Sequence, residues 1–171
     1  TAGTGYVHDY TGALTVVNTV VVTAGNRFPM AITRVYNSND TGEKGGWRFN
    51  YEQTLKVPTD QVDITTYPYV LTDEDGTTHY FKKGDVTYLQ NGESKTASGS
   101  GSLPSAKDED GLKLYVVPVT DATLKETYPL KLIDKSGSQV RYFDKMGRLG
   151  MVTDSNQYEN GKNSATKDHR N

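Results

Sequence analysis

Apolar and polar residues alternate along much of this chain with a period of two, the pattern of a β-strand with two distinct faces. Residues 14–23 are rich in Val and Thr, whose branched side chains fit a pleated strand, and we expect a bulge or turn near Asn18. A second strand is expected over residues 28–36. From Trp47 to Val57 the alternation predicts one continuous, half-buried strand.

A strand, a turn and a second strand recur as a unit. In residues 142–154 the turn begins at Asp144 and ends at Gly147. Asp can accept a hydrogen bond from its own backbone two residues on, and Gly adopts positive φ without a Cβ clash. Residues 71–81 and 132–143 share the spacing Leu-x-Asp-x-x-Gly followed by Tyr-Phe, which comes one residue later in the second copy.

Hairpins of this kind cannot bury an apolar face alone, so they must stack on one another or on a neighbouring sheet. We therefore expect an all-β, predominantly antiparallel fold, in which the hairpin repeats form one curved sheet or two packed sheets. Thr123 and Glu126 have the spacing of a capping box, which predicts one turn of helix at most.

The chain length predicts one β-rich domain over residues 1–156. Asn91-Gly92 is typical of a two-residue hairpin turn. The segment that follows consists mostly of Ser, Gly and Lys, so a mobile loop is expected at residues 90–110. Residues 157–171 contain few apolar side chains and are expected to be a disordered tail or a truncated next repeat.

Composition adds limits to this description. Only 34% of the residues are apolar while Tyr occurs 12 times, which predicts a thin core that relies on aromatic rings. A net charge of −2 gives no field that would recruit nucleic acid or an anionic membrane, and no apolar run approaches the roughly 20 residues of a membrane helix. The absence of Cys excludes disulfides and thiolate chemistry. Because the chain opens without Met or a signal pattern, we expect it to be a fragment.

Residues that could carry chemistry are few. His8, His79 and His169 each lack a second His at metal-ligand spacing. The acidic clusters at residues 73–75 and 108–110 could supply a glycosidase pair or begin a calcium loop, but the remaining calcium ligands are missing, and Asp in such clusters usually serves a turn. We expect these carboxylates to be solvated, and we predict no enzyme, no cofactor and no metal.

The aromatic side chains are the remaining binding candidates. Trp47, Tyr51, Tyr80 and Tyr142 could stack against a glycan if their rings are exposed beside polar groups. The alternative, which we favour, is that most of these rings pack across strands in the sheet interior. Solvent exposure separates the two interpretations.

The last hairpin also resembles a known family. Residues 142–149, with the sequence Tyr-Phe-Asp-Lys-Met-Gly-Arg-Leu, and then Val152 to Asn156 are similar to the unit of Rhs or YD-repeat proteins, in which a Tyr-Asp turn precedes Gly-Arg-Leu and an Asp-rich turn. Here Phe143 stands between the Tyr and the Asp, which departs from that pattern. Four N-terminal motifs occur in the order seen where such proteins enter their repeats, at residues 10–14, 25–29, 34–38 and 45–49.

The resemblance implies a function as well as a fold. In such proteins the hairpins spiral into a large hollow shell, which in bacterial members encloses a C-terminal toxin or other cargo. The chain would then be a non-catalytic structural segment of a secreted or cell-surface, bacterial cell wall-associated protein. Its partners would be further repeats of the same chain and the cargo. The alternative functions are a carbohydrate-binding β module and a glycosidase fragment, the latter requiring two carboxylates about 5 to 10 Å apart across a cleft.

Overall fold

The computed structural model is all-β with antiparallel sheets, which confirms the predicted fold class. It describes residues 3–7, 9, 12–23, 30–39, 45–59, 62–90, 92–110 and 113–154. His8, His169 and the tail predicted over residues 157–171 lie outside these ranges. Within them, no helix has the length and apolar character needed to cross a membrane.

Packing of the backbone divides the chain into two compact units. Unit 1 comprises Thr1–Leu55 and Leu71–His79, and unit 2 comprises Lys56–Val70 and Tyr80–Asn171. The single domain expected over residues 1–156 stays a prediction, because a compact unit is not necessarily a part of the chain that folds alone.

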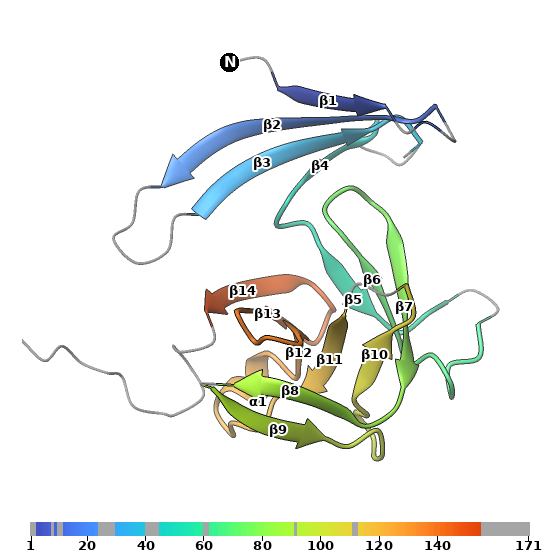
Figure 1. Ribbon diagram of the computed structural model, residues 1–171, viewed down its shortest axis with the longest axis vertical. Helices are drawn as coiled ribbons and strands as arrows, with labels where there is room; N and C mark the ends of the chain where they lie inside the picture. Colours follow the sequence, from blue (N-terminus) through green and yellow to red (C-terminus); the bar gives the residue numbers. More distant parts are fainter. Residues whose placement is uncertain are drawn as a thin grey trace, which may run out of the picture. The chain divides into compact units, whose positions relative to one another are not determined.

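Unit 1 contains a four-stranded sheet with the order β1-β2-β3-β4 (Figure 1). Its strands are β1 (Thr4–Val7), β2 (Leu14–Thr23), β3 (Met30–Asn37) and β4 (Trp47–Phe49). The predicted strand over residues 14–23 is confirmed, and the pairing of β2 with β3 shifts register between Thr19 and Val21, next to the bulge expected near Asn18.

The continuous strand predicted from Trp47 to Val57 is wrong. β4 ends at Phe49, and the next strand, β5 (Thr54–Lys56), belongs to a different sheet. Between them the Glu52 backbone N–H donates to the Phe49 carbonyl at 2.9 Å, while a Glu52 carboxylate oxygen accepts from the Phe49 N–H at 3.1 Å. These bonds close a turn in spite of the alternating pattern, because a side chain has taken over a backbone donor.

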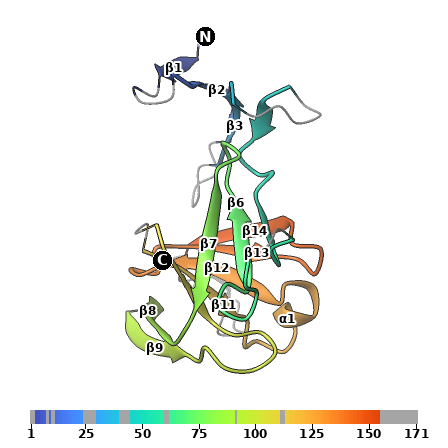
Figure 2. The same cartoon turned by 90° about the vertical axis from the view of Figure 1, so that its right-hand side faces the viewer.

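The second sheet has eight strands in the order β14-β13-β12-β11-β10-β7-β6-β5 (Figure 1). A separate two-stranded ribbon is formed by β8 and β9 (Figure 2). The strands not yet introduced are β6 (Tyr69–Thr72), β7 (Thr78–Lys83), β8 (Val86–Gln90), β9 (Glu93–Ala97), β10 (Ala106–Asp108), β11 (Leu114–Pro118), β12 (Leu130–Asp134), β13 (Gln139–Phe143) and β14 (Leu149–Asp154).

The loop expected at residues 90–110 instead contains two strands, β9 and β10. Gln90 pairs with Glu93, which confirms the two-residue hairpin turn between them. The rest of the segment is held through Ser105, which is 0% exposed and whose hydroxyl lies 2.9 Å from both the Gly84 and the Ala97 carbonyl oxygens. The composition did not predict this order because much of it comes from backbone pairing and from the buried Ser105 hydroxyl, neither of which depends on large apolar side chains.

The core of unit 2 lies between the β8–β9 ribbon and one face of the large sheet. Its buried members are Val86, Tyr88, Val117, Val119, Ile133, Val140 and Tyr142. Strand register places Ala106, Val116 and Leu132 side by side on the opposite face, and these residues are also buried. This part of the sheet is therefore buried on both faces.

The single turn of helix predicted near Thr123 is confirmed as α1 (Leu124–Thr127), but the predicted capping box is wrong. The Thr123 side chain makes no capping hydrogen bond. Instead, the Asp121 carboxylate accepts from the Thr123 N–H at 2.9 Å and from the Leu124 N–H at 2.8 Å. Asp121 precedes the expected cap, and its carboxylate takes up two of the amides at the start of the helix.

Candidate functional site

Three hairpin turns of the chain share one hydrogen-bond geometry. In each, an Asp opens the turn, its backbone carbonyl accepts from the Gly N–H three residues on, and its Oδ1 accepts from the N–H four residues on. The turns begin at Asp73, Asp134 and Asp144, with carbonyl-to-Gly distances of 3.2, 3.0 and 2.9 Å and Oδ1-to-amide distances of 3.0, 3.0 and 2.9 Å.

The glycine of each turn requires the left-handed conformation. Gly76, Gly137 and Gly147 have φ of +86°, +69° and +77°, which residues with a Cβ rarely adopt. The prediction of a repeated Asp-x-x-Gly turn is therefore confirmed at all three positions. Because every bond is made within five residues, the turn is specified by its own short sequence.

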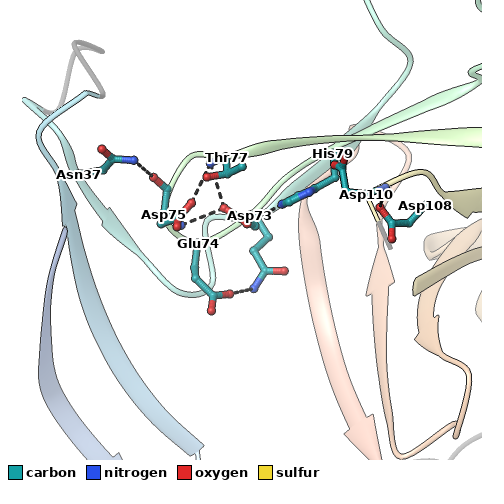
Figure 3. A network of polar contacts seen from close by, with 9 residues as sticks. Asn37, Asp73, Glu74, Asp75, Thr77, His79, Asp108 and Asp110 are labelled. Carbon is teal, nitrogen blue, oxygen red and sulfur yellow. Dashed lines mark hydrogen bonds and ion pairs between the residues drawn. The ribbon is translucent and has the colours of Figure 1, made fainter. Parts of the chain in front are cut away.

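The first turn carries a wider polar network, in which Asn37, Gln53 and His79 contact residues of the turn within unit 1 (Figure 3). His79 Nε2 lies 2.8 Å from Asp73 Oδ2. The side-chain amide of Asn37 donates to the Asp75 backbone carbonyl at 2.9 Å, and the Gln53 amide donates to the Glu74 carboxylate at 2.9 Å. These contacts join the tip of the β6–β7 hairpin to the end of β3 and to the segment before β5.

Proton affinities differ within this network. Burial raises the pKa of Asp73 to about 6, helped by a hydrogen bond with Asp75, although His79 acts in the opposite direction. Burial alone would also raise the pKa of Asp75, but hydrogen bonds from Asp73 and Thr77 outweigh it and lower that pKa. The expectation that this cluster is solvated is therefore wrong for Asp73, which is half-buried.

The arrangement around Asp73 organises the backbone. Its Oδ1 accepts from the Asp75 and Thr77 N–H groups, and its Oδ2 faces His79. A carboxylate held in this way by its own turn is positioned toward the chain rather than toward a substrate. At the second acidic cluster, Asp108 accepts from the Asp110 N–H at 2.9 Å, as predicted for a turn.

The carboxylate between these aspartates is also engaged within unit 2. Glu109 accepts a hydrogen bond from the Tyr67 hydroxyl at 2.8 Å and forms an ion pair with Lys82 at 3.4 Å. Tyr67 and Lys82 belong to separate segments of that unit, so Glu109 acts as a link between them.

A cavity of about 370 Å³ is present in unit 2. Its lining comes from three neighbouring strands and the turn that follows β12, and combines Leu114, Leu132, Asp134, Ser138, Gln139 and Arg141. None of the predicted glycan-stacking residues lines it. Asp134 is engaged in its own turn, where its Oδ2 accepts from the hydroxyls of Ser136 and Ser138 at 2.8 Å.

Two of the predicted glycan-stacking residues belong to unit 2. Tyr142 is 2% exposed and packs in the core, so its proposed role as a stacking platform is corrected. Tyr80 is half-buried, and its backbone carbonyl accepts from the Glu109 N–H at 3.3 Å.

The other two candidates, Trp47 and Tyr51, lie in unit 1 within what we call the aromatic row, which consists of Tyr36, Trp47, Phe49 and Tyr51 together with Arg34. Tyr36 and Trp47 have ring centroids 5.3 Å apart, and Phe49 and Tyr51 stack at 5.1 Å with an angle of 15° between their planes. The Arg34 guanidinium lies over Trp47 at 4.7 Å and over Phe49 at 5.7 Å.

Arg34 and Phe49 were not among the predicted binding residues. Arg34 and Tyr36 stand two apart on β3, and the register pairs them with Phe49 and Trp47. The alternation of apolar and polar positions was visible in the sequence, but the pairing of β3 with β4 was not.

Comparison with known proteins gave one match. A family model described as a domain of unknown function, DUF6531, matches residues 4–81, which is less than half of the chain. Neither a curated protein nor a solved structure matches the chain.

Proposed function

We propose that this chain is a non-catalytic structural segment of a secreted or cell-surface Rhs/YD-repeat protein. Its hairpins would contribute to a shell that encloses or presents a C-terminal toxin or other cargo. The observation that carries this proposal is the tandem hairpin: Asp134 and Asp144 open identical turns ten residues apart, and the strands they connect, β12, β13 and β14, are consecutive neighbours in one sheet.

The end of the large sheet supports the proposal. In the described part of the chain β14 pairs only with β13, so its second edge is open. β14 ends at Asp154, ten residues after Asp144, where the repeat would place the next turn. Open strand edges pair readily with further strands, and natural proteins cover or block them. A following hairpin would cover this edge.

The burial of aromatic rings in unit 2 agrees with a scaffold. Phe81, Tyr88 and Phe143 are 0%, 6% and 0% exposed, as expected when rings pack across strands rather than present faces to a ligand. The family model matched by residues 4–81 is often found in Rhs/YD-repeat proteins, which agrees with the resemblance of the last hairpin.

The experiment uses the full-length natural protein that contains this chain. Under limited proteolysis we expect its C-terminal segment to be protected in the native protein and digested once the shell is opened by denaturant. The same segment expressed alone, the control, would be digested at once. Equal digestion rates for the attached and the isolated segment would overturn the proposal, as would a natural protein without further hairpins after this chain.

Carbohydrate binding is a second candidate function, and one observation favours it. The rings of the aromatic row in unit 1 are half-exposed or exposed, in contrast to those buried in unit 2. A glycan array probed with the chain and with the Trp47→Ala variant tests it. Saturable binding that the substitution abolishes would support this function, and binding to no glycan would exclude it.

A further inference from the structure

We propose that the aromatic row binds an acidic carbohydrate, with a sugar ring stacked on Tyr51 and its carboxylate, or that of the adjacent sugar, bound by Arg34. This inference rests on the second candidate function and is independent of the scaffolding role. It adds to that candidate a class of ligand and a residue that selects it.

The first step concerns which side chains share a face of the sheet. Residues directly opposite each other in an antiparallel pair project to the same side. Tyr36 pairs with Trp47 and Arg34 with Phe49, and positions two apart on a strand also share a face. The three rings and the guanidinium therefore form one surface, and the Phe49–Tyr51 stack extends it beyond the end of β4.

The second step concerns which ring is open to a ligand. Tyr51 is 52% exposed, and Phe49 covers one of its faces in a nearly parallel stack. The exposed area therefore lies on the other face and on the ring edge. Aromatic faces carry negative potential, which attracts the weakly positive C–H groups along one side of a sugar ring. Tyr51 supplies the stacking platform of the proposed site.

The third step concerns charge. Arg34 is exposed, and its guanidinium is held over both Trp47 and Phe49. Stacking on a ring fixes the plane of a guanidinium while its N–H donors point outward in that plane. Such a group matches a carboxylate, which it can bind through two parallel hydrogen bonds. A sugar carrying a carboxylate complements both parts of the surface, whereas a neutral sugar complements only the rings.

The probe is a pair of oligosaccharides that differ only in this group: tetragalacturonate, and its carboxyl-reduced, neutral counterpart. Calorimetric titration of the 171-residue chain is expected to show at least tenfold tighter binding of the acidic member, with an affinity that falls as salt increases. Tyr51→Ala is expected to weaken binding of both members at least tenfold.

Substitutions at Arg34 separate selectivity from stacking. Arg34→Gln is expected to lower the affinity for the acidic probe at least tenfold and to change the affinity for the neutral probe by no more than about twofold. Arg34→Lys is expected to retain part of the preference for the acidic probe over the neutral one. The matched control is Tyr6→Ala, because Tyr6 is 61% exposed and pairs with Thr15, which places it on the opposite face of the same sheet. Near-ultraviolet circular dichroism verifies that each variant is folded.

Equal affinity for the two probes, unchanged by Arg34→Gln, would overturn the acidic specificity and leave carbohydrate binding standing. If the chain binds neither probe and no glycan on the array, both the acidic specificity and carbohydrate binding itself are overturned. If the chain binds no glycan on the array, and the backbone amides of the aromatic row are protected from hydrogen exchange only in the full-length protein, then the row contacts another part of that protein and the inference is wrong. None of these results bears on the protease protection that tests the scaffold.

Discussion

Gly137 lies directly against the backbone of Leu89, so that a Cβ added to this glycine would overlap the Leu89 carbonyl oxygen. The turn between β12 and β13 therefore packs on β8, and the Leu89 N–H donates to the Lys135 carbonyl at 3.2 Å. Gly137 meets two separate demands: its φ is +69°, and no side chain fits above it. The repeated turn is thus also a contact between the large sheet and the β8–β9 ribbon.

The first prediction follows from this contact. We expect Gly137→Ala to lower the free energy of unfolding by about 2 to 4 kcal/mol, because backbone strain and overlap with Leu89 combine. Gly92→Ala is the matched control: Gly92 has φ of +77°, and a methyl group there would meet nothing within 4 Å, so strain alone should cost about 1 kcal/mol. Urea denaturation measures the free energy of unfolding of both variants. Equal losses of stability in Gly137→Ala and Gly92→Ala would show that the contact with Leu89 is unimportant.

The second prediction compares a buried and an exposed tyrosine. Tyr142→Ala is expected to destabilise the chain by about 3 to 5 kcal/mol, since it leaves a cavity in the core of unit 2. Tyr51 is 52% exposed and loses mainly its stack with Phe49, so Tyr51→Ala is expected to cost about 1 kcal/mol. Thermal and urea unfolding of both variants check the ranking, which would be contradicted if Tyr51→Ala cost as much as Tyr142→Ala.

The third prediction concerns the segment expected to be a loop. Ser105→Ala is expected to cost about 1 to 3 kcal/mol, because the Gly84 and Ala97 carbonyls lose the buried hydroxyl they share. Ser102→Ala, at an exposed position of the same segment, is the control and is expected to be neutral. Hydrogen exchange of the amides of residues 97–106 should quicken only in the Ser105 variant; no change there would mean that the hydroxyl does not order the segment.

The fourth prediction concerns pH. The pKa of Asp73 is raised from 3.8 to about 6 in the folded chain, so between these values the folded state holds more protons than the unfolded state. Asp73 therefore makes stability fall as pH rises through this window. The Asp73→Asn variant is expected to show a flatter dependence there, measured by urea unfolding at several pH values.

The control for this pH effect is Asp144, whose pKa is lowered in the folded chain because hydrogen bonds from Arg148 and Met146 outweigh burial. Its contribution has the opposite sign: it is present above the ordinary pKa of 3.8 and is lost as pH falls below it. Asp144→Asn should therefore leave the pH dependence of the free energy of unfolding between pH 4 and about 6 unchanged. If the free energy of unfolding of Asp73→Asn changed with pH as steeply as that of the original chain, the raised pKa of Asp73 would be contradicted.

Local chemistry explains what could be predicted. The turns at Asp73, Asp134 and Asp144 were recognisable because an Asp and a Gly three residues apart determine the whole hydrogen-bond pattern. The strand over residues 14–23 was recognisable because every position contributes to its β propensity. These features need no information from distant parts of the chain.

Features decided by distant contacts could not be predicted. The break after Phe49 is closed locally by Glu52, but it also depends on a distant contact, the hydrogen bond from the Asn50 N–H to the Thr33 carbonyl at 3.1 Å. The strand pattern continues through the break. Tyr142 is 2% exposed because it packs in the core beside the β8–β9 ribbon, whereas Tyr51 is 52% exposed, and the alternation of residue types does not separate the two. The aromatic row depends on the register of β3 with β4, which aligns Arg34 with Phe49.

The self-contained turn has a consequence for how such a chain can change in length. Since each Asp and Gly pair completes the hydrogen bonds of its turn with immediate neighbours, gain or loss of a whole hairpin, two strands with their turns, leaves the other turns intact and the following strands in their original direction. Related genes are therefore expected to differ by increments of about twenty residues, two repeats of the turn spacing. Two turns are in addition fixed to one place in the molecule: the turn of Gly137 by its fit against Leu89, and the turn that begins at Asp73 by hydrogen bonds from Asn37 and Gln53.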